Sequence, residues 1–253
     1  NAAPYAINFK VNPEPDLEQP RVTNIIGNTY LKAGETKTRI TALIDDAYPV
    51  ECKFSKEDVA YDSIPDENKM LCTDDRPDSI SFYCHAELKD LHIGENKFYI
   101  KCKDSSERRN EMTQPFEYIV RGTEPLEIVV VAPSPSGTVF SKNITLAVQT
   151  QKGAEEGKAV CQYSLNNGQF IEFRNTGETL HLQTQTDLQI GHYSYDIKCK
   201  DIAENEATTK IEFDRSSDTE QPSLLNVYKQ SSFLYIILNE ATTCETKNQQ
   251  FTY

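Results

Sequence analysis

The sequence is poor in the features that mark helical, membrane-spanning or enzymatic proteins. It has 253 residues with no tryptophan and only two methionines, and helical periodicity is nowhere sustained. The most apolar stretch, residues 233–238, is far shorter than the roughly 20 residues of a membrane-spanning helix, so we predict no membrane insertion in this segment. Because the chain begins with Asn1 and shows no signal-peptide pattern, we expect a processed product or an interior segment of a longer protein.

Signatures of catalysis and of metal binding are also missing. The sequence contains no G-x-S-x-G, H-E-x-x-H, P-loop or dinucleotide fingerprint, so we predict that the protein is not an enzyme and needs no cofactor. It contains no Cys-x-x-Cys spacing, and its four histidines are scattered over His85, His92, His181 and His192. Zinc ligands are normally closely spaced cysteines and histidines, so we expect no metal site of this kind.

Charge of one sign dominates the composition. There are 39 acidic and 26 basic residues, which gives a net charge of -13, and the two signs are interspersed along the chain. Phosphate groups repel such a surface, which excludes a nucleic-acid partner. An acidic surface suits solubility or the binding of cations.

What the sequence does contain is an internal repeat. Residues 91–104 and 188–201 share a pattern of leucine, glycine and alternating aromatic residues, and both end in Lys-Cys-Lys-Asp at an offset of 97 residues. Self-similarity at a fixed offset is typical of a protein built as an array of one structural unit. Such arrays usually space, present or bind.

The pattern within the repeat predicts β-strands. Tyr193, Tyr195, Ile197 and Cys199 alternate with polar residues, as in a half-buried strand of an antiparallel sheet. Residues 166–168 (Asn-Asn-Gly) separate two short alternating runs and predict a hairpin. We expect six strands in the first unit and seven in the second, at 21–26, 38–43, 52–55, 79–86, 98–102 and 116–120, then at 127–132, 143–148, 161–165, 170–173, 180–186, 193–199 and 207–213. Short strands at this density predict antiparallel β-sandwiches.

The cysteine positions predict disulfides and therefore an oxidising, extracellular location. An early cysteine precedes each repeat cysteine, which suggests the pairs Cys52–Cys102 and Cys161–Cys199. The first interval is 12 residues longer and also holds Cys72 and Cys84, which we expect to form a third bridge that staples the inserted loop 73–83. Cys244 has no expected partner within this chain.

Proline- and acid-bearing joints divide the chain into four parts. Joints at 12–16, 121–125 and 214–222 predict the last strand of a preceding domain at 1–18, domains at 19–121 and 122–217, and the first half of a further domain at 218–253. Short proline-containing joints limit bending, so we expect a semi-rigid array. The half domain would be completed either by a longer native chain or by the N-terminal strand of a neighbouring molecule, which would give a head-to-tail fibre.

These motifs resemble a known family. A Cys-x-Tyr-Ser strand followed by a Leu-x-x-Gly-x-Tyr-x-Tyr-x-Ile-Lys-Cys-Lys-Asp run is similar to the tandem immunoglobulin-like or fibronectin-like repeats of large prokaryotic cell-surface proteins. The resemblance implies an all-β fold of tandem Ig-like sandwiches and an architectural role in stalks, adhesins or appendages. The chain lacks the core tryptophan of antibody domains, and its first cysteine falls on the third predicted strand, so we expect each bridge to join neighbouring strands of one sheet.

Two further kinds of site are suggested by short motifs. Asn143-Ile144-Thr145 is an N-glycosylation sequon in a chain expected to be exported. Calcium, which prefers carboxylate oxygens, is a weaker expectation, since turn acids usually bond to their own backbone. The acids concerned are Asp45, Asp46, Asp74, Asp75, Asp78, Asp104 and Asp201.

We therefore predict a structural segment of an extracellular filament or stalk, whose partners are neighbouring copies or domains of the same protein. The alternative is an adhesin module that binds a surface glycan or partner protein through the loop between Cys72 and Cys84.

Overall fold

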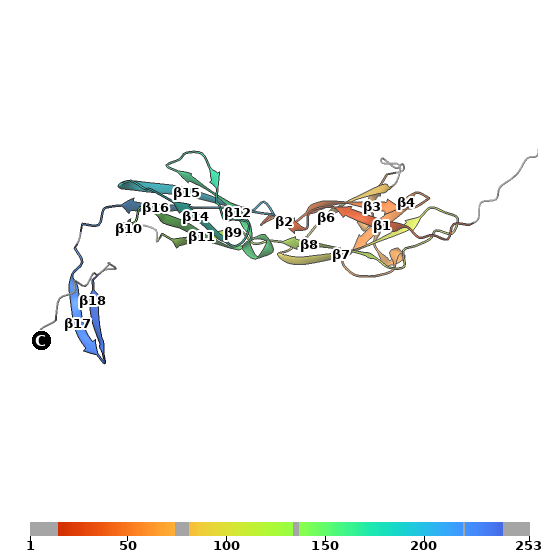
Figure 1. Ribbon diagram of the computed structural model, residues 1–253. Helices are drawn as coiled ribbons and strands as arrows, with labels where there is room; N and C mark the ends of the chain where they lie inside the picture. The colour runs from red at the N-terminus through yellow and green to blue at the C-terminus, as the bar shows by residue number, and fades with distance from the viewer. Residues whose placement is uncertain (1–14, 74–80, 134–136, 220, 240–253) are drawn as a thin grey trace, which may run out of the picture.

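A computed structural model describes residues 15–73, 81–133, 137–219 and 221–239. The described chain is all-β and elongated, with two sandwiches placed end to end and a β-hairpin beyond the second (Figure 1). No described residues form a helix long and apolar enough to cross a membrane.

The first sandwich has two four-stranded sheets, with strand orders β1-β3-β6-β5 and β2-β8-β7-β4. Apart from the short β2, which runs parallel to β8, neighbouring strands are antiparallel. This order matches an Ig-like arrangement of four strands facing the C, F and G strands. The strands are β1 (Arg21–Ile26), β2 (Tyr30–Leu31), β3 (Thr38–Asp45), β4 (Val50–Ser55), β5 (Leu71–Cys72), β6 (Phe82–Leu88), β7 (Gly94–Asp104) and β8 (Phe116–Gly122).

The second sandwich repeats the plan, with sheets β14-β11-β9 and β10-β16-β15-β12-β13. Its short β10 again runs parallel to the last strand, β16. The repeated sequence motif becomes β7 in one sandwich and β15 in the other, so positions 97 apart are structurally equivalent. The strands are β9 (Leu126–Ala132), β10 (Gly137–Val139), β11 (Ile144–Lys152), β12 (Ala159–Leu165), β13 (Ile171–Glu172), β14 (Leu180–Gln185), β15 (Gly191–Asp201) and β16 (Glu206–Arg215).

Each sandwich has a core of its own. Alternate residues of long strands such as β3 point inward, among them Ile40, Ala42 and Ile44. The buried cluster of each sandwich contains residues of that sandwich alone. In the second core the rings of Tyr193 and Phe213 stack at a centroid distance of 5.5 Å. The cores therefore stabilise each unit independently.

The predicted elements overlap the long strands of both sandwiches. The hairpin at 166–168 is present: Asn166 and Asn167 have positive φ (50° and 58°), and the Gly168 N–H donates to the Leu165 carbonyl (2.9 Å). The sequence reasoning missed β2, β5 and β10, which have only two or three residues each. A periodicity of two cannot be recognised over so few residues.

The 12 extra residues of the first unit lie between β4 and β6, where 26 residues separate the strands against 14 between β12 and β14. The prediction placed them in the loop 73–83, of which residues 74–80 lie outside the described ranges. Part of the extra length instead precedes Cys72 and forms two 3-10 turns, η1 (Tyr61–Ser63) and η2 (Asp66–Asn68). The proline and acidic residues of this segment form no periodic pattern from which a strand or a helix could be predicted.

These turns cover the outer face of β4 and β7. The Lys53 ammonium donates to the Ile64 carbonyl (2.9 Å), pairs with Asp66 (2.7 Å) and lies 5.0 Å from the centre of the Tyr61 ring. Burial, with help from nearby carboxylates, raises the pKa of Tyr61 to about 12. The segment is thus held by lysines that project outward from the sheet.

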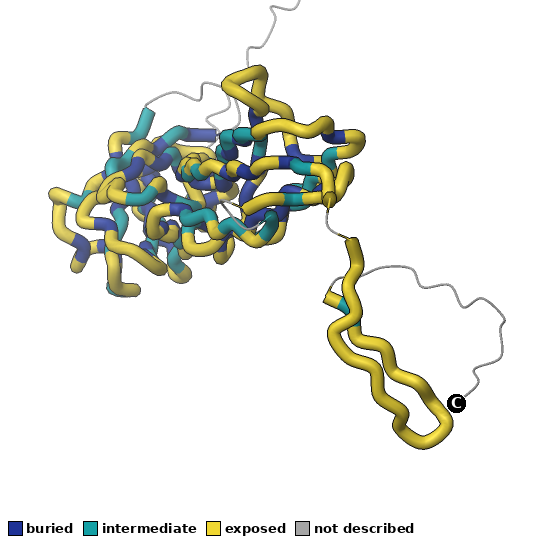
Figure 2. The backbone as a smooth tube through the Cα atoms, turned by 90° about the vertical axis from the view of Figure 1, so that its left-hand side faces the viewer, coloured by how far each residue is buried: buried dark blue, intermediate teal, exposed yellow. Residues whose placement is uncertain are grey.

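The hairpin of β17 (Leu224–Gln230) and β18 (Phe233–Leu238) differs from the rest of the described chain. Nearly all of its residues are exposed (Figure 2). Its large apolar side chains include Phe233 and Leu225, which are 69% and 64% exposed. The two described strands form no core of their own, and the half domain expected at 218–253 stays a prediction.

A buried histidine ties the two sheets of the second sandwich together. His181 on β14 is fully buried, with Nε2 2.8 Å from the Thr150 hydroxyl and Nδ1 2.8 Å from the Thr176 hydroxyl. Because Thr150 donates its own proton to the Gly157 carbonyl (2.6 Å), it accepts from Nε2, and Nδ1 is left to accept from Thr176. The neutral ring fits this network, and burial lowers the pKa of His181.

We expect the free energy of unfolding of the second sandwich to fall as the pH drops below about 6.5, the ordinary histidine value. Below this pH the unfolded chain takes up a proton on His181 that the folded chain binds less readily. The contribution of neutral His181 to the free energy of unfolding is therefore fully present above this pH and is lost as the pH falls below it. Denaturant unfolding between pH 7 and 5.5 measures the effect, and His181→Gln should flatten the profile. Equal stability of the parent protein at both pH values would contradict this assignment.

Candidate functional site: cross-strand disulfides and the joint between sandwiches

The repeat cysteines form disulfides between neighbouring strands of one sheet. Cys52 on β4 lies directly opposite Cys102 on β7, and Cys161 on β12 lies opposite Cys199 on β15, with Cα atoms 4.0 Å apart in both pairs. All four residues are fully buried. The pairs and their position within a single sheet are those that the sequence predicts.

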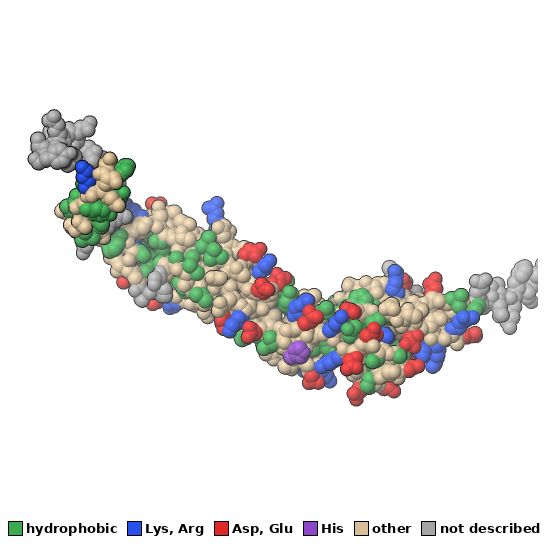
Figure 3. All heavy atoms as spheres, turned by 90° about the horizontal axis from the view of Figure 1, so that it is seen from below, with side chains coloured by type: hydrophobic (Ala, Val, Ile, Leu, Met, Phe, Trp, Pro, Cys, Tyr) green, Lys and Arg blue, Asp and Glu red, His purple; other side chains and the backbone are tan. Residues whose placement is uncertain are grey.

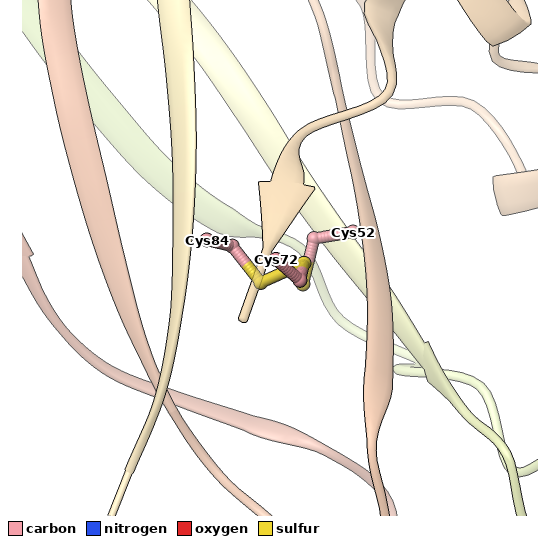
Figure 4. Close-up of side chains that lie close together, drawn as sticks. All are labelled: Cys52, Cys72 and Cys84. Carbon is pink, nitrogen blue, oxygen red and sulfur yellow. A yellow bond between two sulfur atoms is a disulfide. The ribbon is translucent and has the colours of Figure 1, made fainter. Parts of the chain in front are cut away.

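The third disulfide joins Cys72 and Cys84 in the opposite sheet of the first sandwich. Figure 4 shows Cys52 reaching toward this pair, and the three sulfurs lie within 4.8 Å of one another. Every one of them is already in a disulfide, so no thiolate is available here for a metal. The Met70 N–H donates to the Cys52 carbonyl (2.8 Å) just before β5 pairs with β6, so this segment links both sheets.

Each repeat strand ends in an aspartate that organises the following turn. Asp201 accepts the backbone N–H and the side-chain Nδ2 of Asn205 (2.9 and 2.8 Å), and also the Ala154 N–H (2.7 Å). Asp104 makes the matching bonds to Asn110 (2.9 and 2.8 Å). Both carboxylates therefore have a structural role in turns, which is the role that aspartate most often has in such positions.

Asn205 also makes the joint between the two sandwiches. Its Nδ2 donates to the Thr123 hydroxyl (2.9 Å) in the linker, and its Oδ1 accepts the Ala33 N–H (2.7 Å) of the first sandwich. Thr123 in turn donates to the Leu31 carbonyl (2.6 Å). Asn205 and Thr123 are both buried, so these bonds are shielded from competing water. One side chain thus connects two folded units and the linker between them.

Charges around the joint are complementary. Lys198 and Lys200, with the first sandwich's Lys32, hold the pKa of the Glu206 carboxyl below its usual range, Lys198 through a hydrogen bond. On the face shown in Figure 3, basic and acidic side chains are intermixed over the first sandwich and the joint and are sparser over the second sandwich. The surface thus keeps the mixed pattern of the sequence and carries no continuous basic stripe on this face.

The remaining predicted site residues do not assemble into one site. Asn143 is exposed at the start of β11, with its Oδ1 accepting the Asp187 N–H (3.2 Å), and its glycosylation stays a prediction. The histidines are dispersed, with His85 bonded to Thr41 and His192 to Asp214, each at 2.9 Å.

Two of the predicted acidic residues, Asp46 and Asp104, lie together with Asp16, which was not predicted, at the N-terminal end of the first sandwich. Carboxylate oxygens of Asp16, Asp46 and Asp104 lie within 4.8 Å of one another, whereas Asp45 pairs with Arg21 (3.0 Å). Calcium binding stays a prediction. Asp74, Asp75, Asp78 and Cys244 lie outside the described residues.

The chain is similar to known proteins in its fold. No family model and no curated protein matches the sequence. Among solved structures, the chain is similar to the fibronectin(III)-like modules of CbhA from Clostridium thermocellum (TM-score 0.43, 9% identity, covering 79% of this chain and 95% of that one). It is also similar to an I-band fragment of titin (TM-score 0.45, 10% identity, covering 82% of this chain and 70% of that one). A third similar structure holds the first five immunoglobulin domains of Sidekick-1 (TM-score 0.44, 10% identity, covering 85% of this chain and 42% of that one).

The joint makes a direct prediction about flexibility. Asn205→Ala removes the bonds to Ala33 and Thr123, so the two sandwiches should reorient independently, and the second should lose about 1 to 3 kcal/mol of stability because buried groups lose partners. NMR residual dipolar couplings report whether the sandwiches share one alignment.

Two variants test this interpretation. Asn110→Ala disturbs the equivalent turn at the far end of the first sandwich and should leave the shared alignment unchanged. Ala33→Pro removes only the N–H donor. Proline suits this position because Ala33 precedes Gly34 (φ 85°) in a turn closed by the Glu35 N–H and the Lys32 carbonyl. If the sandwiches stay aligned in both Asn205→Ala and Ala33→Pro, the joint is not what fixes them.

Proposed function

We propose that this chain is a structural segment of an extracellular surface stalk or filament, in which serial Ig-like sandwiches hold a distal part of the assembly away from the cell. The observation that carries the proposal is the joint, in which Asn205 bonds to both the linker and the preceding sandwich. A flexible tether would need no buried bonds between its units, whereas a spacer that keeps its length does.

The disulfides give such a stalk resistance to extension. Each bridge joins two neighbouring strands of one sheet, so the chain between the two cysteines stays closed even when the rest of the sandwich unfolds under tension. In the chain-entropy model, loops of this size each stabilise the fold by about 4 kcal/mol. Bridges of this kind persist in oxidising compartments, which supports an extracellular location.

The stalk proposal is tested by labelling intact source cells with a membrane-impermeant reagent, followed by electron microscopy with antibodies to the chain. Labelled protein in regular surface projections is the expected result. Protein that becomes labelled only after lysis would exclude this function. The alternative, an adhesin that recognises a glycan or partner protein through the loop 73–83, concerns residues that lie mostly outside the described ranges.

The mechanical role predicts specific lengths in single-molecule force measurements. Reduction should add about 175 Å of extended chain to the unfolding of the first sandwich, whose main bridge spans 50 residues, and about 130 Å to that of the second, whose bridge spans 38.

The double variant Cys161→Ala with Cys199→Ala should lengthen only the second event, so the first sandwich is an internal control. Reduction of the parent protein during pulling covers the case in which this variant fails to fold. Unfolding lengths that are the same before and after reduction would contradict the proposed role of the bridges.

A further inference from the structure

The turn at the N-terminal end of the first sandwich is a second copy of the turn that makes the joint. In each, the aspartate N–H donates to the asparagine carbonyl (3.0 Å from Asp104 to Asn110, 3.1 Å from Asp201 to Asn205). In each, the asparagine N–H and Nδ2 donate back to the aspartate at 2.9 and 2.8 Å. The residue before each asparagine has positive φ, 52° at Arg109 and 64° at Glu204. The two turns therefore present their asparagines in the same way.

The linkers also approach the two asparagines alike. Nδ2 of Asn205 donates to Thr123 in the linker ahead of the second sandwich, and Nδ2 of Asn110 lies 3.3 Å from the carbonyl oxygen of Asp16, in the linker ahead of the first. The two asparagines differ in the hydrogen bonding of their side-chain oxygen, Oδ1. Oδ1 of Asn205 accepts the Ala33 N–H of the preceding sandwich, whereas no described residue donates to Oδ1 of Asn110. Within the described ranges, the receiving half of the joint is therefore present at this end without a donor.

The donating half belongs to the fold as well. In the first sandwich it is the loop after β2, where Leu31 pairs with Gly122 at the end of β8. In the second sandwich, Val139 pairs in the same way with Arg215 at the end of β16, and the Val139 carbonyl accepts from the Ser216 N–H (3.0 Å), much as Leu31 accepts from Thr123. Both described sandwiches therefore have a loop after a short parallel strand at the C-terminal end and an Asp-Asn turn at the N-terminal end.

Charge at the two ends is mixed and includes one complementary pair of features. The donating end of the first sandwich carries Lys32, while its Arg121 is paired with Glu95 (3.3 Å). The receiving end carries the group Asp16, Asp46 and Asp104, together with the exposed Arg108 and Arg109. A lysine such as Lys32 on a docked sandwich would be attracted to the three carboxylates.

We propose that the Asn110 end of the first sandwich is a docking surface for another sandwich of the same kind, joined ahead of Asp16 in the chain, whose loop after its second strand donates a backbone N–H to Asn110 Oδ1. This inference rests on the serial arrangement in the proposed function and names the partner of the N-terminal end of the first sandwich. The partner is recognised through the backbone of the loop after its second strand.

The test adds that partner to the full chain. A duplicate of residues 16–122 is placed directly ahead of Asp16 in the 253-residue protein, so a complete sandwich with its own core and disulfides precedes the original one. The duplicate is isotopically labelled by segmental ligation, and its residual dipolar couplings and amide exchange are measured. The expected result is one alignment shared with the original first sandwich, and exchange of the duplicate's Ala33 amide about tenfold slower than in the Asn110→Ala variant.

Two variants of the extended chain test whether the hydrogen bond to Asn110 Oδ1, and not a change in folding, determines the alignment. Asn110→Ala in the original sandwich removes the acceptor, and Ala33→Pro in the duplicate alone removes the donor from a turn that suits proline. Both should abolish the shared alignment, while the Asn205 joint stays intact as the internal standard. An independently aligned duplicate in the parent extended chain, or a shared alignment that survives both variants, would overturn the proposal. Because purified protein is used, this outcome is independent of where the native protein resides.

Discussion

The structure depends first on a disulfide that joins two adjacent strands at the centre of each sandwich. In both units the bridge fixes the strand that carries the repeat motif, and two residues beyond the bridged cysteine the same strand ends in Asp104 or Asp201. The position of this aspartate is therefore coupled to the most strongly fixed point of the core. A joint built on it has a rigid base, which a joint built on a free loop would lack.

The two units are connected to each other by few hydrogen bonds. Asn205 is held by Asp201 and contacts both the linker and the preceding sandwich, so one buried side chain relates the two cores. The hydrophobic clusters of the two sandwiches remain separate. Each sandwich is thus stabilised by its own core, while hydrogen bonds between the sandwiches set their relative orientation. This division suits an array in which units are added in series.

Much of this architecture can be predicted from sequence because its signals are periodic or repeated. The strand alternation around Tyr195, the hairpin at Asn166 and Asn167, the disulfide pairs and the turn after Cys199 all leave patterns within one repeat. The joint leaves almost no such pattern, since Ala33 and Asn205, which connect the two sandwiches directly, are 172 residues apart and Ala33 contributes only a backbone N–H. The 3-10 turns over β4 and β7 were missed for a related reason, because they are held by side-chain contacts such as those of Lys53 and have no periodicity. The equivalence of Asn110 and Asn205 could have been noticed, as both follow a Lys-Cys-Lys-Asp run.

The most direct test of the account is differential alkylation of the protein taken from its source, with free thiols blocked at harvest and mass spectrometry before and after reduction. The account predicts that Cys52, Cys72, Cys84, Cys102, Cys161 and Cys199 resist alkylation until a reductant is added, and that the peptides link in the pairs seen in the structure. Alkylation of Cys102 or Cys199 without reduction would contradict it, because the strand that carries each joint aspartate would then have no covalent anchor.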